Sequence, residues 1–331
     1  MNFCRLFTIV AITAAISLAQ AQNVKQNCAA AHYKLTELPL HPARINRAGV
    51  VVGTTEDHKP AWWTQKDGVH EIDLPNGFGS GEATAINSSG VIVGFATRSG
   101  SNEPIAFRYA DGKLSLLSGD PSKALAINDA GNIAGVSANH LVVWRGNKIA
   151  PLADCCGGVI HGISQNGEVV GRINDKEGHY TAFVWNGQHG LESIAPPHST
   201  MSTALAINDA GHILIQRYTP NEVYLRVAGE LTLIPLASDA ASQPLGMSNC
   251  DVIVGEFGAA SDFYHAFAWD RKNGLRDLNQ FTPRAEGWIL ESAVDINDRG
   301  QIVGIGDHGN EQDVGFLLSP EIEPRPEPTQ K

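Results

Sequence analysis

The sequence has little of what would indicate a nucleic-acid or membrane partner. Lys and Arg number 24 against 35 Asp and Glu, which gives a formal net charge of −11 at pH 7. Phosphate binding needs clustered cationic side chains, so this balance argues against nucleic acid and anionic membranes as partners. Beyond residue 21, no apolar run is long enough to cross a bilayer. We expect a soluble monomer whose acidic copies repel one another.

The sequence also lacks the motifs that would indicate a reaction. It contains no G-x-S-x-G, no H-E-x-x-H and no phosphate-binding loop. The glycine-rich stretch 77–81 lies between two expected strands, with no helix behind it to present a dipole to phosphate. We therefore predict no cofactor.

The first 21 residues have the pattern of a secretory signal. Arg5 supplies the positive start, residues 6–18 form a short apolar run, and residues 19–21 (Ala-Gln-Ala) form a cleavage site of the A-x-A type. A membrane anchor is the alternative, but it needs a longer apolar core. We predict export to a periplasm or to the outside of the cell. Loss of Arg5 leaves 23 basic against 35 acidic residues, a net charge of −12.

A nine-residue pattern, Ile-Asn-x-x-Gly-x-Ile/Val-Val-Gly, occurs seven times with small departures. Its central glycine, or Asp251 in the sixth copy, recurs at steps of 41, 41, 36, 44, 40 and 49 residues. A period near 40 with many strand signals is typical of radially repeated β-units, most often a propeller. We predict that residues 22–319 form one seven-bladed β-propeller and that the proline-rich residues 320–331 form a disordered tail. The copies cover residues 45–53, 86–94, 127–135, 163–171, 207–215, 247–255 and 296–304.

Each repeat has room for four antiparallel strands. In the second copy these are residues 82–86, 91–96, 104–109 and 113–117, joined by short polar turns. The Asn-x-x-Gly segment is expected to be a hairpin turn, because glycine accepts a positive φ and the asparagine side chain can bond backbone groups of the turn. Calcium loops are the alternative for the Asn-Asp-x-Gly copies, but they lack the alternating acidic ligands and the distal glutamate.

The third strand of most repeats carries aromatic residues two positions apart, for example Phe107 and Tyr109. Residues two apart share one face of a strand, so we interpret these rings as core between neighbouring blades. A ring of ligand-stacking aromatics is the alternative.

These repeats resemble the HAF repeat of bacterial extracellular proteins. The segment His265-Ala266-Phe267 matches the name-giving tripeptide, and the Ile-Asn-x-x-Gly element is the other half of that repeat. The resemblance covers residues 43–318, and it implies the repeat fold and export but no catalytic residues. The fifth copy departs most, with Ile215 in place of the last glycine and Tyr224 in its third strand.

The two ends of the chain are expected to meet in the last blade. The seventh copy ends with a third strand at residues 314–320, whereas residues 33–39, before the first copy, have the pattern of a fourth strand. We predict that this N-terminal strand pairs with residues 316–319 and closes the ring.

Four cysteines follow the signal sequence. In the closed ring Cys28 and Cys250 belong to adjacent blades on the same side, so a disulfide between them is one option in an oxidising compartment. Cys155 and Cys156 then form a vicinal pair or, more simply, two partly buried thiols. No C-x-x-C spacing occurs, so no metal site is predicted.

Function is expected on one face of the ring. In propellers the loops between second and third strands and the loops between blades share one face around the channel, and such loops commonly carry function. The simpler alternative is that polar loops contain polar residues, since no ligand spacing indicates a metal. Trp288, in the longest connection, is either an exposed contact or a plug at the edge of the core. The candidate binding residues are His58, His140, Asp175, His179, His265, His308 and Trp288.

The predicted function is binding or scaffolding, in which an exported propeller presents its loop-rich face to a protein or a glycan. The alternative is a propeller-type lyase or glycoside hydrolase that uses His and carboxylate groups of that face. An enzyme should bring ionisable groups with perturbed pKa values together at one mouth of the channel, whereas a binding module should expose an aromatic or apolar patch. The sequence favours no catalytic pair of carboxylates.

Overall fold

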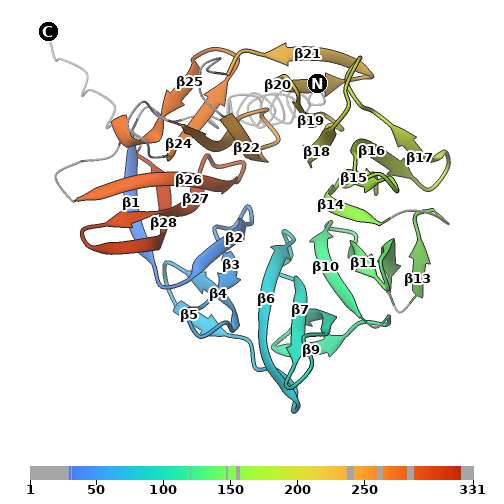
Figure 1. The fold of residues 1–331 in the computed structure, drawn as a ribbon. Helices are drawn as coiled ribbons and strands as arrows, with labels where there is room; N and C mark the ends of the chain where they lie inside the picture. Colours follow the sequence, from blue (N-terminus) through green and yellow to red (C-terminus); the bar gives the residue numbers. More distant parts are fainter. Residues whose placement is uncertain are drawn as a thin grey trace, which may run out of the picture.

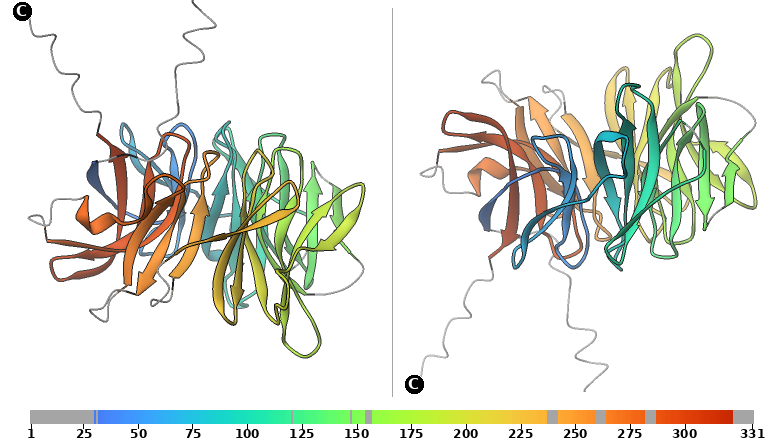
Figure 2. Two further views of the ribbon diagram at one scale, coloured as in Figure 1. Left: turned by 90° about the horizontal axis from the view of Figure 1, so that it is seen from above. Right: turned by 90° about the horizontal axis from the view of Figure 1, so that it is seen from below.

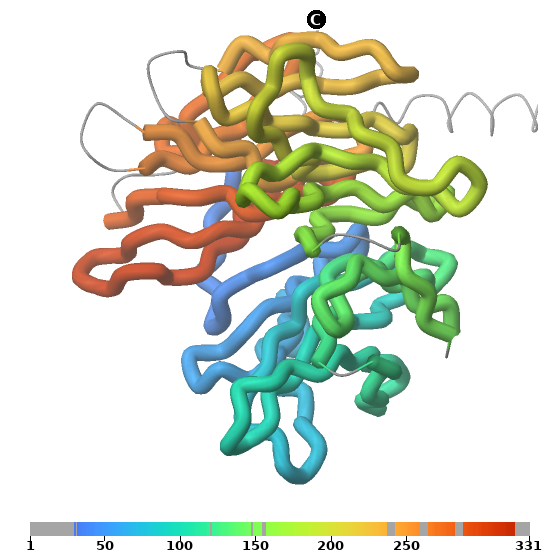
Figure 3. Tube along the Cα trace, turned by 45° about the vertical axis from the view of Figure 1, so that its right-hand side comes forward, coloured from blue at the N-terminus to red at the C-terminus, as the bar shows by residue number. Residues whose placement is uncertain are grey.

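The computed structural model describes residues 30, 32–119, 121–146, 148–153, 157–236, 242–258, 264–281 and 287–321. They form seven four-stranded antiparallel sheets around a central axis (Figure 1), which confirms the predicted seven-bladed β-propeller. The tube view shows the blades following one another around the ring in chain order (Figure 3). The predicted signal, residues 1–21, lies outside the described residues. Among the described residues, no helix is long and apolar enough to span a bilayer.

The first four blades each contain four consecutive strands. Blade one consists of β2 (His41–Ile45), β3 (Val51–Thr54), β4 (Pro60–Thr64) and β5 (Gly68–Glu71); blade two of β6 (Phe78–Ile86), β7 (Ile92–Arg98), β8 (Pro104–Ala110) and β9 (Lys113–Leu116). Blade three consists of β10 (Ser122–Ile127), β11 (Asn132–Ser137), β12 (His140–Arg145) and β13 (Lys148–Pro151); blade four of β14 (Gly158–Ile163), β15 (Val169–Asn174), β16 (Tyr180–Asn186) and β17 (Gly190–Ser193).

Blades five and six repeat this arrangement, and blade seven combines both ends of the chain. Blade five consists of β18 (Ser202–Ile207), β19 (Ile213–Tyr218), β20 (Asn221–Val227) and β21 (Glu230–Ile234); blade six of β22 (Ser242–Met247), β23 (Ile253–Gly258), β24 (Tyr264–Asp270) and β25 (Gly274–Asp277). A 3-10 turn, η1 (Leu278–Gln280), follows, and blade seven consists of β26 (Trp288–Ile296), β27 (Ile302–His308), β28 (Glu311–Pro320) and β1 (Tyr33–Leu38).

The N-terminal strand closes the ring as predicted. β1 pairs with β28 from Tyr33 opposite Pro320 to Leu38 opposite Gly315, so the blue strand lies beside the red strands in Figure 1. Pro320, which the sequence assigned to the tail, is thus the last residue of a strand; residues 322–331 lie outside the described residues. Arg276 of blade six also contacts the segment before β1, because its Nη1 donates to the Ala30 carbonyl at 2.7 Å.

The Asn-x-x-Gly segments form the expected hairpin turns. Gly90 has a φ of +83°, and the Val91 N–H donates to Asn87 Oδ1 at 2.9 Å. Asp251 takes the glycine position in the sixth turn with a φ of +59°, a conformation that Asp adopts more easily than most residues.

In blade two, packing leaves no room for a side chain at the last glycine of the pattern. In all seven blades the pairing of the first two strands shifts by one residue, in blade two between Ala83 and Ala85, which is a β-bulge. A Cβ at Gly94 would lie 1.9 Å from the Glu82 carbonyl oxygen and 2.9 Å from Phe107 Cζ. The glycine therefore allows both the bulged strand and the aromatic ring to approach.

The third-strand phenylalanines are core residues. Phe107, Phe183, Phe267 and Phe316 are fully buried, and the cluster around Phe107 also contains Val52 of the preceding blade. The interpretation as core between blades is confirmed, and the alternative of a ligand-stacking ring is wrong for these residues, because their rings are enclosed by neighbouring strands.

Cys250 is disulfide-bonded. Its side chain packs against the core cluster that contains Ala30 and Tyr33. Cys28, Cys155 and Cys156 lie outside the described residues, so the pairing of Cys28 with Cys250 stays a prediction, which non-reducing peptide mapping would test.

Candidate functional site

The propeller has two faces of different construction. The loops between second and third strands and the loops between blades form one face, which we call the loop-rich face. The turns between first and second strands, and between third and fourth strands, form the opposite face, which we call the turn face. The strands cross the ring between these two faces (Figure 2).

On the turn face, the motif asparagine ties one blade to the next. Asn46 Nδ2 donates to the Asn87 carbonyl at 3.1 Å, and Asn297 Nδ2 donates to the Asn46 carbonyl at 2.9 Å across the closure of the ring. The sequence predicted only the bonds inside each turn, because the partner lies 41 residues away in the case of Asn46. We call this set the asparagine belt; its donors are Asn46, Asn87, Asn128, Asn208 and Asn297, all buried.

A cavity of about 310 Å³ opens at the turn-face mouth of the channel. The residues after the motif asparagines line it and bridge blades: the Ser88 N–H donates to Asp129 Oδ1 at 2.8 Å, and the Asp209 N–H donates to Asn249 Oδ1 at 2.7 Å. Burial raises the pKa of Asp209, the carboxylates of Asp298 and Asp129 raise it further, and the Asn249 amide opposes the rise. These polar groups serve the junctions between blades.

A second cavity of about 160 Å³ lies inside the channel, where mainly aliphatic residues surround Arg44, His161 and Asp295. Burial lowers the pKa of His161 to about 4, and the charges of Arg44 and Arg172 lower it in the same sense. Burial raises the pKa of Asp295, whereas Arg44 and the Ile45 N–H, at 2.9 Å, favour its ionised form. The His161 ring is therefore neutral at pH 7.

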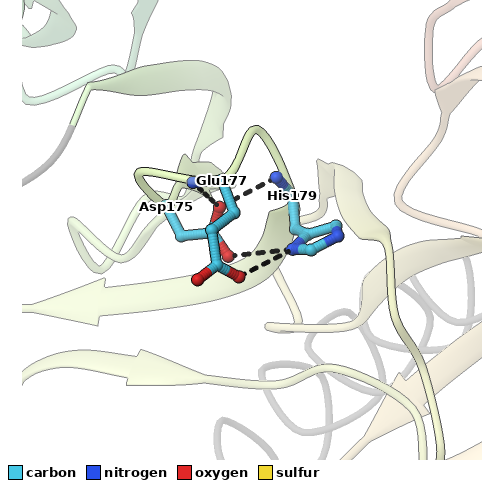
Figure 4. A group of neighbouring side chains, drawn as sticks. All are labelled: Asp175, Glu177 and His179. Carbon is cyan, nitrogen blue, oxygen red and sulfur yellow. Dashed lines mark hydrogen bonds and ion pairs between the residues drawn. The ribbon is translucent and has the colours of Figure 1, made fainter.

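On the loop-rich face, the hairpin between β15 and β16 gathers three side chains at one point (Figure 4). Candidate ligand atoms of Asp175, Glu177 and His179 lie within 4.8 Å of one another, and all three residues are exposed. His179 Nδ1 lies 3.2 Å from Asp175 Oδ2 and 3.7 Å from Glu177 Oε2. Two carboxylates and an imidazole could together hold a divalent cation at this open position.

The same hairpin fixes the Asp175 carboxylate by backbone contacts. Its Oδ1 accepts the N–H groups of Glu177 and His179, both at 2.9 Å. Desolvation opposes ionisation, but these N–H groups and the His179 ring hold the pKa of Asp175 below its usual value. The carboxylate is therefore ionised and pre-oriented at neutral pH.

Trp288 is only 6% exposed and packs in the core cluster of blades six and seven. The plug alternative is therefore correct and the exposed-contact alternative is wrong, because burying the large ring against Phe316 is favourable. His308 stacks on the indole with ring centroids 4.6 Å apart, and its Nδ1 lies 2.9 Å from Glu37 Oε2 on the closing strand.

The other predicted residues lie apart from one another. His58 is exposed in the β3–β4 loop of blade one, and His140 is exposed at the start of β12 in blade three. His265, in blade six, forms a half-buried pair with Asp277, with His265 Nδ1 3.0 Å from Asp277 Oδ2. Among the predicted residues that the structure describes, it brings together Asp175 with His179 and Trp288 with His308.

Two further groups on the loop-rich face lie outside the candidate binding residues. In blades six and seven, burial raises the pKa of Glu291, and the carboxylates of Asp307, Asp313 and Glu256 raise it further. The sequence held no signal for this group beyond the abundance of acidic loop residues.

The second group lies between blades four and five. The guanidinium of Arg172 lies 4.4 Å from the ring centroid of Tyr180, which meets Tyr218 edge to face at 5.4 Å. On blade five, Arg217 and the Tyr224 hydroxyl both donate to the Glu222 carboxylate. In the sequence, the departure of the fifth copy from the repeat pattern was the feature that pointed to this group.

Comparison with known proteins supports the fold. No protein-family model and no curated protein matches the sequence. The β-propeller domain of the Trilobed protease from Pyrococcus furiosus is similar, with a TM-score of 0.59 at 10% identity over 87% of this chain and 95% of that chain. TolB from Acinetobacter baumannii has a TM-score of 0.50 at 13% identity over 88% and 96%.

The extracellular domain of BT4673 from B. thetaiotaomicron is a further similar structure, with a TM-score of 0.55 at 9% identity over 88% of this chain and 40% of that chain. At such low identities the likeness shows the propeller fold alone. The resemblance to HAF repeats stays a prediction.

Proposed function

We propose that this chain is an exported binding or scaffolding module that presents its loop-rich face to a protein or glycan partner. The observation that carries the proposal is the different use of polar side chains on the two faces. On the turn face the repeated groups donate and accept between blades. On the loop-rich face the polar and aromatic groups change from blade to blade, as expected of loops that recognise a partner.

The proposal of export is supported by the pattern of residues 1–21 and by the similarity to an extracellular domain. Expression with the complete N-terminus should give a secreted or periplasmic product that begins at Gln22. N-terminal sequencing checks this, and a cytoplasmic product that retains Met1 would contradict it.

Site-specific photo-crosslinking tests the proposed face. A photoreactive residue replaces Lys176 on the loop-rich face or Ser89 on the turn face, both at exposed positions. Covalent adducts with a protein or a glycan are expected from position 176 and not from position 89. Adducts from the turn face alone, or in equal amounts from both faces, would overturn the proposal.

A lyase or glycoside hydrolase is the second candidate, and the group Asp175, Glu177 and His179 favours it. Elemental analysis of the purified protein and of the variant Asp175→Ala/His179→Ala tests this candidate. One equivalent of divalent metal that is lost in the variant would support it. Equal metal contents in the two proteins would remove its structural basis.

A further inference from the structure

The surface between blades four and five contains two arginines and one carboxylate. Val170 of blade four and Ile215 of blade five belong to one core cluster, so these two sheet faces meet. Arg172 follows Val170 by two residues and Arg217 follows Ile215 by two residues, and residues two apart share a strand face. Both guanidinium groups therefore enter the same space at its loop-rich end. We call this space the four–five wedge; it contains Arg172, Tyr180, Arg217, Glu222 and Tyr224.

The carboxylate of the wedge is already engaged. Glu222 Oε2 accepts from both Arg217 Nη2 and the Tyr224 hydroxyl, and Arg217 Nη1 also donates to the Pro197 carbonyl at 2.9 Å. Arg217 is thus balanced by Glu222. The wedge retains one positive charge, on Arg172.

Three arginines of the described residues bury an Nε that has no hydrogen-bond partner, namely Arg172, Arg217 and Arg276. Arg217 pairs with Glu222, and Arg276 pairs with Asp270 at 3.3 Å. Arg172 forms no hydrogen bond or ion pair with any described residue. A half-buried guanidinium without a counter-charge is unfavourable unless a ligand supplies the missing acceptor.

Arg172 is also held in position. Its guanidinium lies over the Tyr180 ring, and the edge-to-face contact with Tyr218 fixes that ring in turn. Its charge extends to the channel, where it contributes to the low pKa of His161. The donor is therefore oriented before any ligand binds.

We infer that Arg172 binds a carboxylate of a polypeptide partner, and that the four–five wedge recognises an acidic segment of that partner. The planar guanidinium matches a carboxylate with two parallel N–H···O bonds. This inference rests on the proposed function, because it names the partner chemistry of the loop-rich face.

The covered faces of the two tyrosine rings favour a polypeptide over a glycan as the partner. Sugars stack on open aromatic faces, but Arg172 lies over Tyr180 and Arg217 lies over Tyr224 at 5.9 Å. Tyrosine and arginine together are also the residues enriched at the centres of protein interfaces. The carboxylates of the adjoining hairpin, Asp175 and Glu177, turn toward His179 (Figure 4).

The test measures fluorescence anisotropy of labelled peptides with the full chain. The first probe is a peptide with four glutamates, and the second is the same peptide with glutamines in their place; both have amidated C-termini. The third probe is a neutral peptide with a free C-terminal carboxylate. The glutamate peptide should bind better than the glutamine peptide, and Arg172→Gln should weaken its binding about tenfold or more. Arg172→Lys keeps the positive charge but cannot form two parallel hydrogen bonds with one carboxylate. We therefore expect its affinity to lie between those of the wild type and Arg172→Gln. Tighter binding of the peptide with the free C-terminal carboxylate would show that Arg172 recognises the C-terminus of the partner and not its acidic side chains.

The matched control is Arg145→Gln, which removes an equal charge from an exposed position on the turn face and should leave affinity unchanged. His161 provides a second readout by NMR, because saturating glutamate peptide should raise its pKa by offsetting the charge of Arg172. A purely structural role of Arg172 would lower the melting temperature of Arg172→Gln and leave affinity as in the wild type.

Equal affinity of Arg172→Gln and the wild type for the glutamate peptide would overturn the inference. Binding of oligogalacturonate but not of any peptide would overturn it too, because the partner would then be an acidic glycan. If the Arg172→Gln background leaves the yield of the adduct at position 176 unchanged, this inference fails while the proposed function stands. If position 176 gives no adduct even in the wild type, the proposed function itself fails.

Discussion

The two faces of the propeller use polar side chains in opposite ways. On the turn face, buried amides such as Asn87 and Asn297 donate to the carbonyl of the following blade, and the same bond occurs at five of the seven junctions, whereas Ser164 and Ser248 take the position in blades four and six. On the loop-rich face, the groups differ between blades and are exposed or paired locally, as in the hairpin of Asp175 and His179. The repeated side chains of the turn face therefore hold neighbouring blades together, and the variable side chains of the loop-rich face are available to recognise a partner.

Blades five and six show how one repeat departs without losing its core. In blade six the buried Phe267 pairs with Gly255, whereas in blade five Ile215 takes the glycine position and is itself fully buried. Tyr224, opposite Ile215, is only half-buried and donates to Glu222. The isoleucine fills the core in place of the aromatic ring, and the tyrosine becomes available to the four–five wedge.

The largest effect is expected from a glycine that the repeat requires. In Gly94→Ala the new Cβ meets the Glu82 carbonyl and the Phe107 ring, and overpacking of this kind should lower the free energy of unfolding by about 3 kcal/mol or more. Urea denaturation checks this against Glu82→Ala, which alters only an exposed side chain. A loss no larger than that of the control would mean that blade two accommodates a side chain at this position, as blade five accommodates Ile215 beside its own bulge.

The channel between the two faces should make stability depend on pH. The pKa of His161 is about 4 in the folded protein against 6.5 as its ordinary value. Between these values the unfolded chain binds the proton and the folded chain does not, so stability falls as the pH drops from 6.5 to 4, by up to about 3 kcal/mol. His161→Gln should reduce this fall, and urea midpoints at pH 7 and pH 4 measure it. An equal loss of stability between pH 7 and pH 4 in the wild type and in His161→Gln would contradict this explanation.

A smaller loss is expected when one member of the asparagine belt is removed. Asn87→Ala removes the bond to the Asn128 carbonyl, which keeps the Gly131 N–H, and leaves the Val91 N–H without its acceptor; the two losses together should cost about 2 kcal/mol. Asn87→Ser imitates the natural Ser164 of blade four, whose hydroxyl accepts within the turn, and should lose less. Calorimetric melts rank the variants; the loss in Asn87→Ser measures the bond between blades, and an Asn87→Ser variant as stable as the wild type would show that this bond contributes nothing.

The smallest effect on stability is expected on the loop-rich face. Asp175→Ala/His179→Ala removes exposed groups that contact only their own hairpin. The melting temperature should stay unchanged at pH 7. A clear decrease would show that this face also supports the fold, and the contrast between the faces would weaken.

Features that follow from chain period and local conformation could be predicted from the sequence. The number of blades, the positive φ at Gly90 and the closure by Tyr33 to Leu38 are of this kind. Contacts that arise only when the ring closes could not be predicted, and the bond from Asn46 to blade two is the clearest case. The candidate site was found only in part, because whether Trp288 turns inward or outward depends on packing that no local pattern encodes.

The asparagine belt has one further consequence. Each amide points from one blade to the next in the same direction, and the bond from Asn297 to Asn46 across the seam is the same as the others. The closure of the ring is therefore stabilised by the same kind of bond as four other blade junctions. His32 and Glu321 lie side by side at the seam, because the Glu321 N–H donates to the His32 carbonyl at 3.0 Å. A gene that joined these two positions by a short linker and began in another inter-blade loop would encode a circular permutant of the same propeller.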